Sequence, residues 1–259
     1  MMKRLSIELK KITRYPTFWV FIGLYVLMVS LLFCAFPTIK FNGPLSALTL
    51  KSYYTFPDIW HTLTYIAGLF NLMLGVMVVI LITNEFTFRT VRQNIIDGWS
   101  VMDFLSAKVI LLLFLALCTT IFVFIFGIVY GVIASPIMDS SAIFSEVSYI
   151  IAYFVQSLAY LCFALFMGTL FKKAGMGIIF FLVYSKIVEP LIGWKLPDTI
   201  SDYLPFHNIS KLIDIPAIKI GGMTIYHSDS PLGIHFILTL VYSAAFVSAT
   251  YLLLKKRDN

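Results

Sequence analysis

Residues 109–133 read VILLLFLALCTTIFVFIFGIVYGVI, a run of 25 residues without a charged side chain. A helix of about 20 apolar residues crosses the hydrocarbon core of a bilayer. Further long apolar runs lie at 17–36, 63–83, 149–171, 175–191 and 234–254. In the chain of 259 residues, 60% are hydrophobic and only 12% are charged, whereas soluble domains are about 25% charged. The sequence predicts an all-α, polytopic membrane protein with six transmembrane helices, and it excludes a large soluble enzyme domain.

The basic residues predict the orientation of these helices. With the N-terminus in the cytoplasm, 13 of the 19 Lys and Arg residues fall on cytoplasmic loops and ends, in agreement with the positive-inside rule. They are Lys3, Arg4, Lys10, Lys11, Arg14, Arg89, Arg92, Lys108, Lys172, Lys173, Lys255, Lys256 and Arg257. We therefore expect a single domain over residues 1–259, in the plasma (inner) membrane, with both termini in the cytoplasm. No nucleic-acid partner is needed to explain the net charge of +6.

The segment before the first span, residues 1–16, is predicted to form an amphipathic N-terminal helix. Winding it at about 100° per residue places its apolar residues on one face and its basic residues opposite. The apolar face consists of Met1, Met2, Leu5, Leu9 and Ile12. Such a helix lies in the headgroup plane and contacts membrane lipid. A compatible alternative is that the basic residues only fix the topology.

The loop between the second and third spans, residues 84–108, mixes charged, amide and aromatic side chains. A short helix at about 85–96 would present aromatic and apolar groups beside two arginines, which suits a protein partner. The projecting side chains would be Phe88, Arg89, Arg92, Ile95 and Ile96. The alternative is a solvated loop whose cations contact lipid phosphate.

The third helix is predicted to begin before its apolar run. Ser100 and Asp103 match the capping-box pattern of a helix start, and the turn signal Asp97-Gly98 precedes them. The helix therefore begins outside the hydrocarbon and passes Lys108 on its way into the membrane.

The order of these features resembles that of ABC-2 type transporter permeases: a basic amphipathic N-terminal helix, six spans, a loop that begins with Glu, a turn with Ser, and a Lys before the third span. The matching residues are Glu85, Thr90, Val91, Arg92, Ser100 and Lys108. The hairpin at 165–177 is also similar to the family's turn of small residues.

This resemblance implies a cytoplasmic coupling helix at 85–98, between helices 2 and 3, that docks on a separate ABC ATPase subunit. The implied docking residues are Glu85, Phe88, Arg89, Arg92, Ile95 and Ile96. It also implies two ATPase copies and a second permease chain, identical or homologous. The chain holds no G-x-x-x-x-G-K-[ST] motif, which cradles nucleotide phosphates. ATP and Mg are therefore expected on the partner, with no cofactor and no enzymatic activity in this chain.

The predicted function is that of the permease subunit of an ATP-driven exporter of a hydrophobic or amphipathic substrate. One alternative is a secondary transporter driven by an ion gradient, although such carriers typically show internal repeats and interrupted helices, which are not evident here. The other alternative is an intramembrane enzyme, but the sequence contains neither G-x-S-x-G nor H-E-x-x-H. The histidines show no ligand spacing, so no metal site is expected.

Two ionisable residues, Lys186 and Glu189, lie in the fifth span. Being three residues apart, they share a helical face and could pair, which makes them candidates for an outer gate. Alternatively both extend to the outer headgroups, because Pro190 ends the helix. For the outer region 192–233, the resemblance implies short helices in the outer leaflet, and an ordinary external loop is the alternative.

The second span carries Gly68, Asn71 and Gly75, and the fourth carries Gln156. Small and amide side chains of this kind indicate close approach between membrane helices. We expect a packing role for them, within this chain or between two permeases.

Overall fold

The computed structural model describes residues 8–35, 37, 53–91, 93, 98–135, 143–216, 219–220, 223–224 and 231–258. Within this part of the chain, six helices are long and apolar enough to cross a membrane. They are Pro16–Ala35, Ile59–Thr87, Val101–Ala134, Ser148–Phe171, Ala174–Lys195 and Ile234–Lys256. Each overlaps one predicted run, and the prediction of an all-α membrane fold is confirmed.

The spans are divided into the following elements. The second contains α3 (Ile59–Leu69) and α4 (Asn71–Thr87), and the fifth contains α9 (Ala174–Val183), the π-helix η4 (Tyr184–Val188) and α10 (Glu189–Lys195). The others are α2 (Pro16–Ala35), α6 (Val101–Ala134), α8 (Ser148–Phe171) and α13 (Ile234–Asp258). The shorter elements are α11 (Asp198–Ser201), α12 (Pro205–Lys211) and the antiparallel strands β1 (Lys219–Ile220) and β2 (Met223–Thr224).

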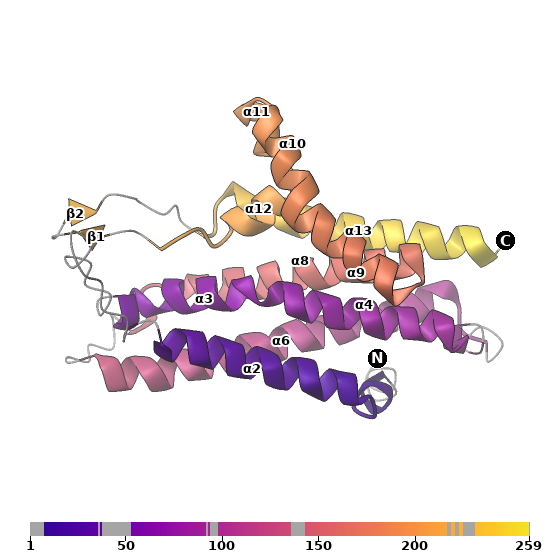
Figure 1. Cartoon of the computed structure of the whole chain (residues 1–259), viewed down its shortest axis with the longest axis horizontal. Coiled ribbons are helices and arrows are strands. Elements are labelled where there is room, and N and C mark those ends of the chain that lie inside the picture. The colour runs from indigo at the N-terminus through magenta and orange to yellow at the C-terminus, as the bar shows by residue number, and fades with distance from the viewer. Residues whose placement is uncertain are drawn as a thin grey trace.

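The helix α8 forms the centre of the bundle. It packs against α4, α6, α9 and α13 and is the most buried of the six spans. The fifth span leaves this bundle obliquely, so that α10 and α11 stand away from it (Figure 1). The short helices α11 and α12 follow the fifth span, and their place in the outer leaflet stays a prediction.

One end of the bundle carries most of the described basic residues. There α2 begins, α4 and α13 end, and α8 turns into α9 (Figure 1). The basic residues at these positions are Lys10, Lys11, Arg14, Arg89, Lys172, Lys173, Lys255 and Lys256. We term this end the basic end.

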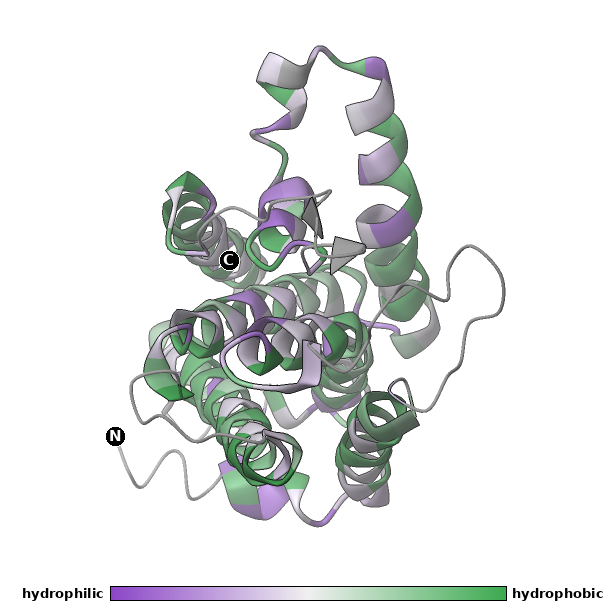
Figure 2. Ribbon diagram, turned by 90° about the vertical axis from the view of Figure 1, so that its left-hand side faces the viewer, coloured by the Kyte–Doolittle hydropathy of each residue, from purple (hydrophilic) through white to green (hydrophobic). Residues whose placement is uncertain are grey.

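The outward faces of the long helices are apolar, as Figure 2 shows by their green colour. Along α2, Leu24 and Leu31 are exposed, whereas Val29 and Phe33 are fully buried against the bundle. A soluble protein rarely exposes so many apolar side chains on every side. Lipid is the solvent that matches this surface.

Glycines allow the second span to approach its neighbours closely. A methyl group on Gly75 would lie 2.2 Å from the ring of Phe181 in α9, and one on Gly68 would lie 2.6 Å from Oε1 of Gln156 in α8. Both contacts are far too short for a real side chain. The expected packing role of Gly68 and Gly75 is thus seen within the chain itself.

A series of hydrogen-bonded, buried polar side chains crosses the bundle. The hydroxyls of Tyr25 (α2) and Tyr153 (α8) lie 2.5 Å apart, and Tyr153 donates to Oδ1 of Asn71 over 3.3 Å. Asn71 donates to Oε1 of Gln156 over 3.4 Å, and Gln156 Nε2 donates to the carbonyl of Ile209 in α12 over 2.9 Å. Polar groups inside a membrane must find partners in the protein. This series of hydrogen bonds therefore holds α12 against α8.

Replacing Gln156 with Leu should lower stability, because it leaves the carbonyl of Ile209 and the amide of Asn71 without their partners. We expect a loss of about 1–3 kcal/mol, measured as a lower thermal unfolding midpoint of the detergent-purified chain. The control is Ile151→Ala, at an exposed position of α8. Equal midpoints for both variants would contradict the role assigned to Gln156.

Candidate functional site

The described part of the N-terminal segment is helical at residues 8–12 and turns into α2 at 13–15. Ile12 is buried, whereas Lys10 and Arg14 are exposed. This division agrees with the predicted amphipathic pattern. Residue Glu8, however, is completely buried, and the helical pattern alone gave no reason to expect that.

The buried carboxylate of Glu8 is paired with Lys108. Nζ of Lys108 lies 2.5 Å from Oε2 of Glu8 and 2.5 Å from Oε1 of Glu85. Glu8 also contacts Nζ of Lys11 at 3.4 Å. With Lys11 included, two carboxylates thus meet two ammonium groups, and the formal charges of these four residues sum to zero. We term Glu8, Lys108 and Glu85 the tripartite cluster, because it joins the N-terminal helix, α6 and α4.

Local sequence explains why Lys108 points into this cluster. The helix α6 begins with the predicted capping box: the Asp103 backbone N–H donates to Ser100 Oγ over 3.1 Å, and Ser100 N–H donates to Asp103 Oδ2 over 3.2 Å. Both bonds satisfy groups that a helix start leaves without partners. Because the capping box fixes where the helix begins, Lys108 falls on the buried face about two turns later. Its ammonium lies 5.1 Å from the ring centre of Phe104.

The described residues form the predicted helix at 85–96 only in part: α4 runs through Glu85, and residues 90, 91 and 93 are helical again after the corner. Glu85 still belongs to α4, which continues to Thr87. The chain then turns at Arg89, whose φ of 56° is left-handed and cannot continue a right-handed helix. The Thr90 hydroxyl donates to the Glu85 carbonyl over 3.1 Å and closes this corner. The membrane-spanning helix therefore ends after Glu85, at Thr87, and Glu85 belongs to this helix and not to the loop.

The predicted docking residues divide into three groups. The side chains of Phe88 and Arg89 are exposed at the corner after α4, and Phe88 is 62% accessible. Glu85 points inward to Lys108 and is a structural residue in this geometry. The remaining candidates, Arg92, Ile95 and Ile96, lie outside the described residues. We term Phe88 and Arg89 the α4 corner.

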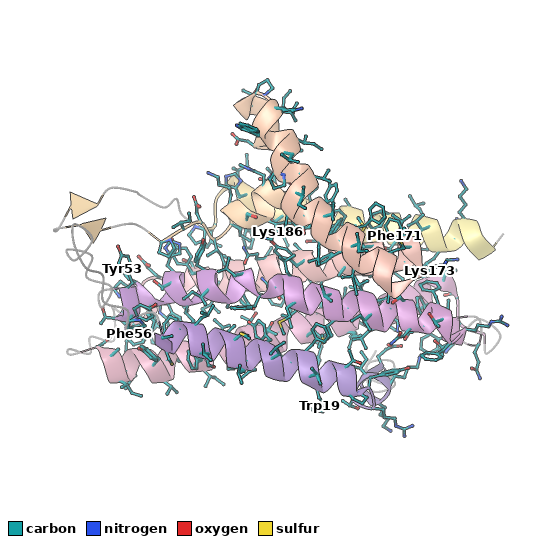
Figure 3. All side chains as sticks on the ribbon, in the orientation of Figure 1. Trp19, Tyr53, Phe56, Phe171, Lys173 and Lys186 are labelled. Carbon is teal, nitrogen blue, oxygen red and sulfur yellow. The ribbon has the colours of Figure 1, made fainter. Side chains whose placement is uncertain are left out.

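The turn between α8 and α9 lies near this corner. Lys172 has a left-handed φ of 55°, and its ammonium lies 5.5 Å from the ring centre of Phe86 in α4. Figure 3 shows the neighbouring residues Phe171 and Lys173 at this same basic end. Cation–π contacts of this kind contribute about 0.5–1 kcal/mol at exposed sites. The α8–α9 turn and α4 therefore form one basic-aromatic surface.

The two ionisable residues of the fifth span are not paired with each other. Glu189 is buried and accepts a hydrogen bond from the His207 backbone N–H over 2.8 Å. Lys186 is exposed and forms no salt bridge with the other described residues (Figure 3). The wider turn of the π-helix η4 rotates position i+3 off the face of position i. Their role in an outer gate stays a prediction.

The six apolar helices and the lipid-facing surface define a multi-pass membrane protein. The family model described as ABC-2 family transporter protein matches residues 4–187, more than two thirds of the chain. The chain therefore belongs to the ABC-2 transporter family, and it is a permease, the membrane-spanning part of an ABC transporter. Comparison with curated proteins and with solved structures finds no match.

Sequence reasoning did not predict the role of Glu8. A signal was available, since Glu8 is the only acidic residue among the first 14. A lone acid in a basic amphipathic segment indicates a specific cation partner. The identity of that partner, 100 residues further along the chain, could only come from the structure.

Replacing Lys108 with Met should destabilise the protein strongly, because two carboxylates then lose their central cation. Removing one partner of a buried ion pair costs about 3–5 kcal/mol. The measurement is the thermal unfolding midpoint, with Lys10→Met at an exposed position as the control. The triple variant Lys108→Met, Glu8→Gln, Glu85→Gln should recover much of the loss. A Lys108→Met midpoint equal to that of the control would show that the cluster carries no stability.

Proposed function

We propose that this permease exports a hydrophobic or amphipathic substrate and is energised by a separate ATPase subunit that docks on the α4 corner. The observation that carries the proposal is the exposure of Phe88 and Arg89 at the end of a membrane-spanning helix. Arg is enriched among the residues that dominate the binding energy of protein interfaces, and Phe is enriched at interfaces relative to the rest of the surface. Membership in the ABC-2 family supports the same assignment.

The packing around this corner suits it to transmit movement. α4 runs along α8, the centre of the bundle, so displacement of its end would reach the membrane core. The tripartite cluster binds α4 to α6 and to the N-terminal helix. Close-packed elements shift as units because they do not deform continuously. A closing pair of ATPases would thus move three segments together.

The proposed orientation places the basic end in the cytoplasm of a cell with its plasma (inner) membrane around the bundle. The concentration of Lys and Arg at that end supports it. Both chain termini would then be cytoplasmic, on the side where ATP is made. The α4 corner lies at the same end (Figure 1).

The proposed assembly contains two permease chains, identical or homologous, and two ATPases that bind ATP and Mg. The substrate path would run between the permeases, and this chain would hold no cofactor of its own. Exposed apolar residues on α10, such as Leu191 and Ile192, support a route or an interface along the arm that leaves the bundle.

The double variant Phe88→Ala, Arg89→Glu tests the docking site. Since both side chains are exposed, we expect normal membrane insertion and an unchanged unfolding midpoint. The P-loop ATPase recovered with the tagged wild-type chain, identified by mass spectrometry, should fall at least ten-fold. ATP-driven transport should fall with it.

The matched control is Lys256→Glu, a charge reversal at an exposed position of the same end, which should retain the ATPase. Normal ATP-driven transport by the double variant would refute the docking site. Transport by the lone purified chain under an ion gradient would refute the ATP-driven mechanism altogether.

A further inference from the structure

A pocket lies between α12 and the second, fourth and fifth spans. Its volume is about 300 Å³, at the lower end of the range for small-molecule sites. Its walls come from α3, α8, η4 and α12 and from the residues that follow α12. Figure 3 shows Lys186, which lines this pocket, where the fifth span leaves the bundle. The pocket therefore joins three spans and one short helix.

The ammonium group of Lys186 has no anionic partner in the described part of the chain. Lys186 is exposed, and none of the salt bridges among the described residues includes it. It belongs to a span, and an ionisable residue inside a span marks a functional site by default. Its own segment, η4, is π-helical, and π-helical turns occur frequently at functional sites. An accessible, uncompensated cation in this setting can bind an anion.

A second ammonium group, that of Lys211, lines the same pocket. Its Nζ lies 3.9 Å from Oδ2 of Asp214, and its side chain is still 46% exposed. Asp214 also lines the pocket, and its Oδ1 accepts the backbone N–H of Ile215 over 2.8 Å. Among the described residues, two ammonium groups thus face one carboxylate. One positive charge is left without a counter-ion.

The other nearby carboxylates are bound elsewhere. Glu189, three residues after Lys186, accepts the His207 backbone N–H over 2.8 Å and is not among the described residues that line this pocket. The carboxylate of Asp202 lies 3.3 Å from the imidazole of His207. An anion from outside this part of the chain is therefore needed to complement the two lysines.

The rim of the pocket is apolar. Leu69, at the end of α3, and Ile215, after α12, both line the pocket and are 50% and 51% exposed. Apolar surface of this kind binds a hydrocarbon tail because contact removes both from water. Two cations beside exposed aliphatic side chains match a molecule with an anionic end and an apolar tail.

We propose that Lys186 and Lys211 bind the carboxylate or phosphate of an anionic, amphipathic substrate, whose tail leaves the pocket over Leu69 and Ile215. Hydrogen bonds between an ammonium and such an anion are charge-assisted and stronger than neutral ones. The inference rests on the proposed transport function, whose substrate class it specifies. An anionic phospholipid headgroup shares this chemistry, and the experiment distinguishes the two sources.

The test measures binding of dodecanoate, with a fluorophore at the far end of its tail, to the full-length chain in phosphatidylcholine nanodiscs. The methyl ester of this probe has the same tail and no charge, and empty nanodiscs give the background. We expect Lys186→Gln to weaken dodecanoate binding about ten-fold, because one charged hydrogen-bond donor is lost. The response to the ester should not change. Lys195→Gln, at an exposed position of the same span outside this pocket, should bind like the wild type.

Two further variants protect the test against misfolding. Lys186→Arg keeps a cation and should retain most of the affinity. Asp214→Asn keeps an acceptor for the Ile215 N–H and removes the competing charge beside Lys211, so dodecanoate should bind several-fold more tightly. Damage to the fold would not produce tighter binding. Equal affinity of Lys186→Gln and wild type for dodecanoate, or weaker binding by Asp214→Asn, would overturn the proposal.

The last arm identifies the source of the anion. In nanodiscs that contain phosphatidylglycerol, the membrane charge repels the probe equally for both proteins, so the ratio of wild-type to Lys186→Gln affinity is compared. This ratio should stay at about ten. A ratio of one would assign the pocket to the lipid headgroup and overturn the substrate assignment. Lys186→Gln should still recover the ATPase in the pull-down, so failure of this proposal is distinguishable from failure of the docking site.

Discussion

The need to neutralise Lys108 inside the protein organises the basic end of this permease. An ammonium group at this depth cannot reach water, because its residue is 1% exposed. Two carboxylates from segments far apart in the sequence therefore converge on it, Glu8 from before α2 and Glu85 from α4. The consequence is that the N-terminal helix is fixed to the bundle through a buried charge. This helix is therefore attached to the protein itself and does not only lie on lipid.

A comparable arrangement holds α12 towards the other end. Gln156 of α8 donates to the carbonyl of Ile209, and Glu189 of the fifth span accepts the N–H of His207. Side chains from two spans thus satisfy backbone groups of one short helix. Because α8 also packs along α4, the helix that ends at the α4 corner is connected through α8 to α12. A displacement of α4 would therefore reach α12 along this route.

Much of the fold was predictable from local sequence. The length and apolarity of six runs predicted the spans, and Ser100 with Asp103 predicted where α6 begins. The end of α4 was not predictable, because Asn84 and Glu85 are polar residues typical of a loop, and only the pairing with Lys108 explains why the helix continues past them. The separation of Lys186 from Glu189 depends on a π-helix, which leaves no signal in hydrophobic periodicity.

The exposed aromatic residue at the end of α4 offers the most direct test of how this permease is energised. A photo-crosslinking amino acid would be placed at Phe88, with Phe144, an exposed residue near the start of α8, as the comparison. After irradiation of native membranes, mass spectrometry would identify the attached proteins. The account predicts a crosslink from position 88 to a P-loop ATPase and none from position 144. Crosslinks from position 88 to lipid alone would contradict it.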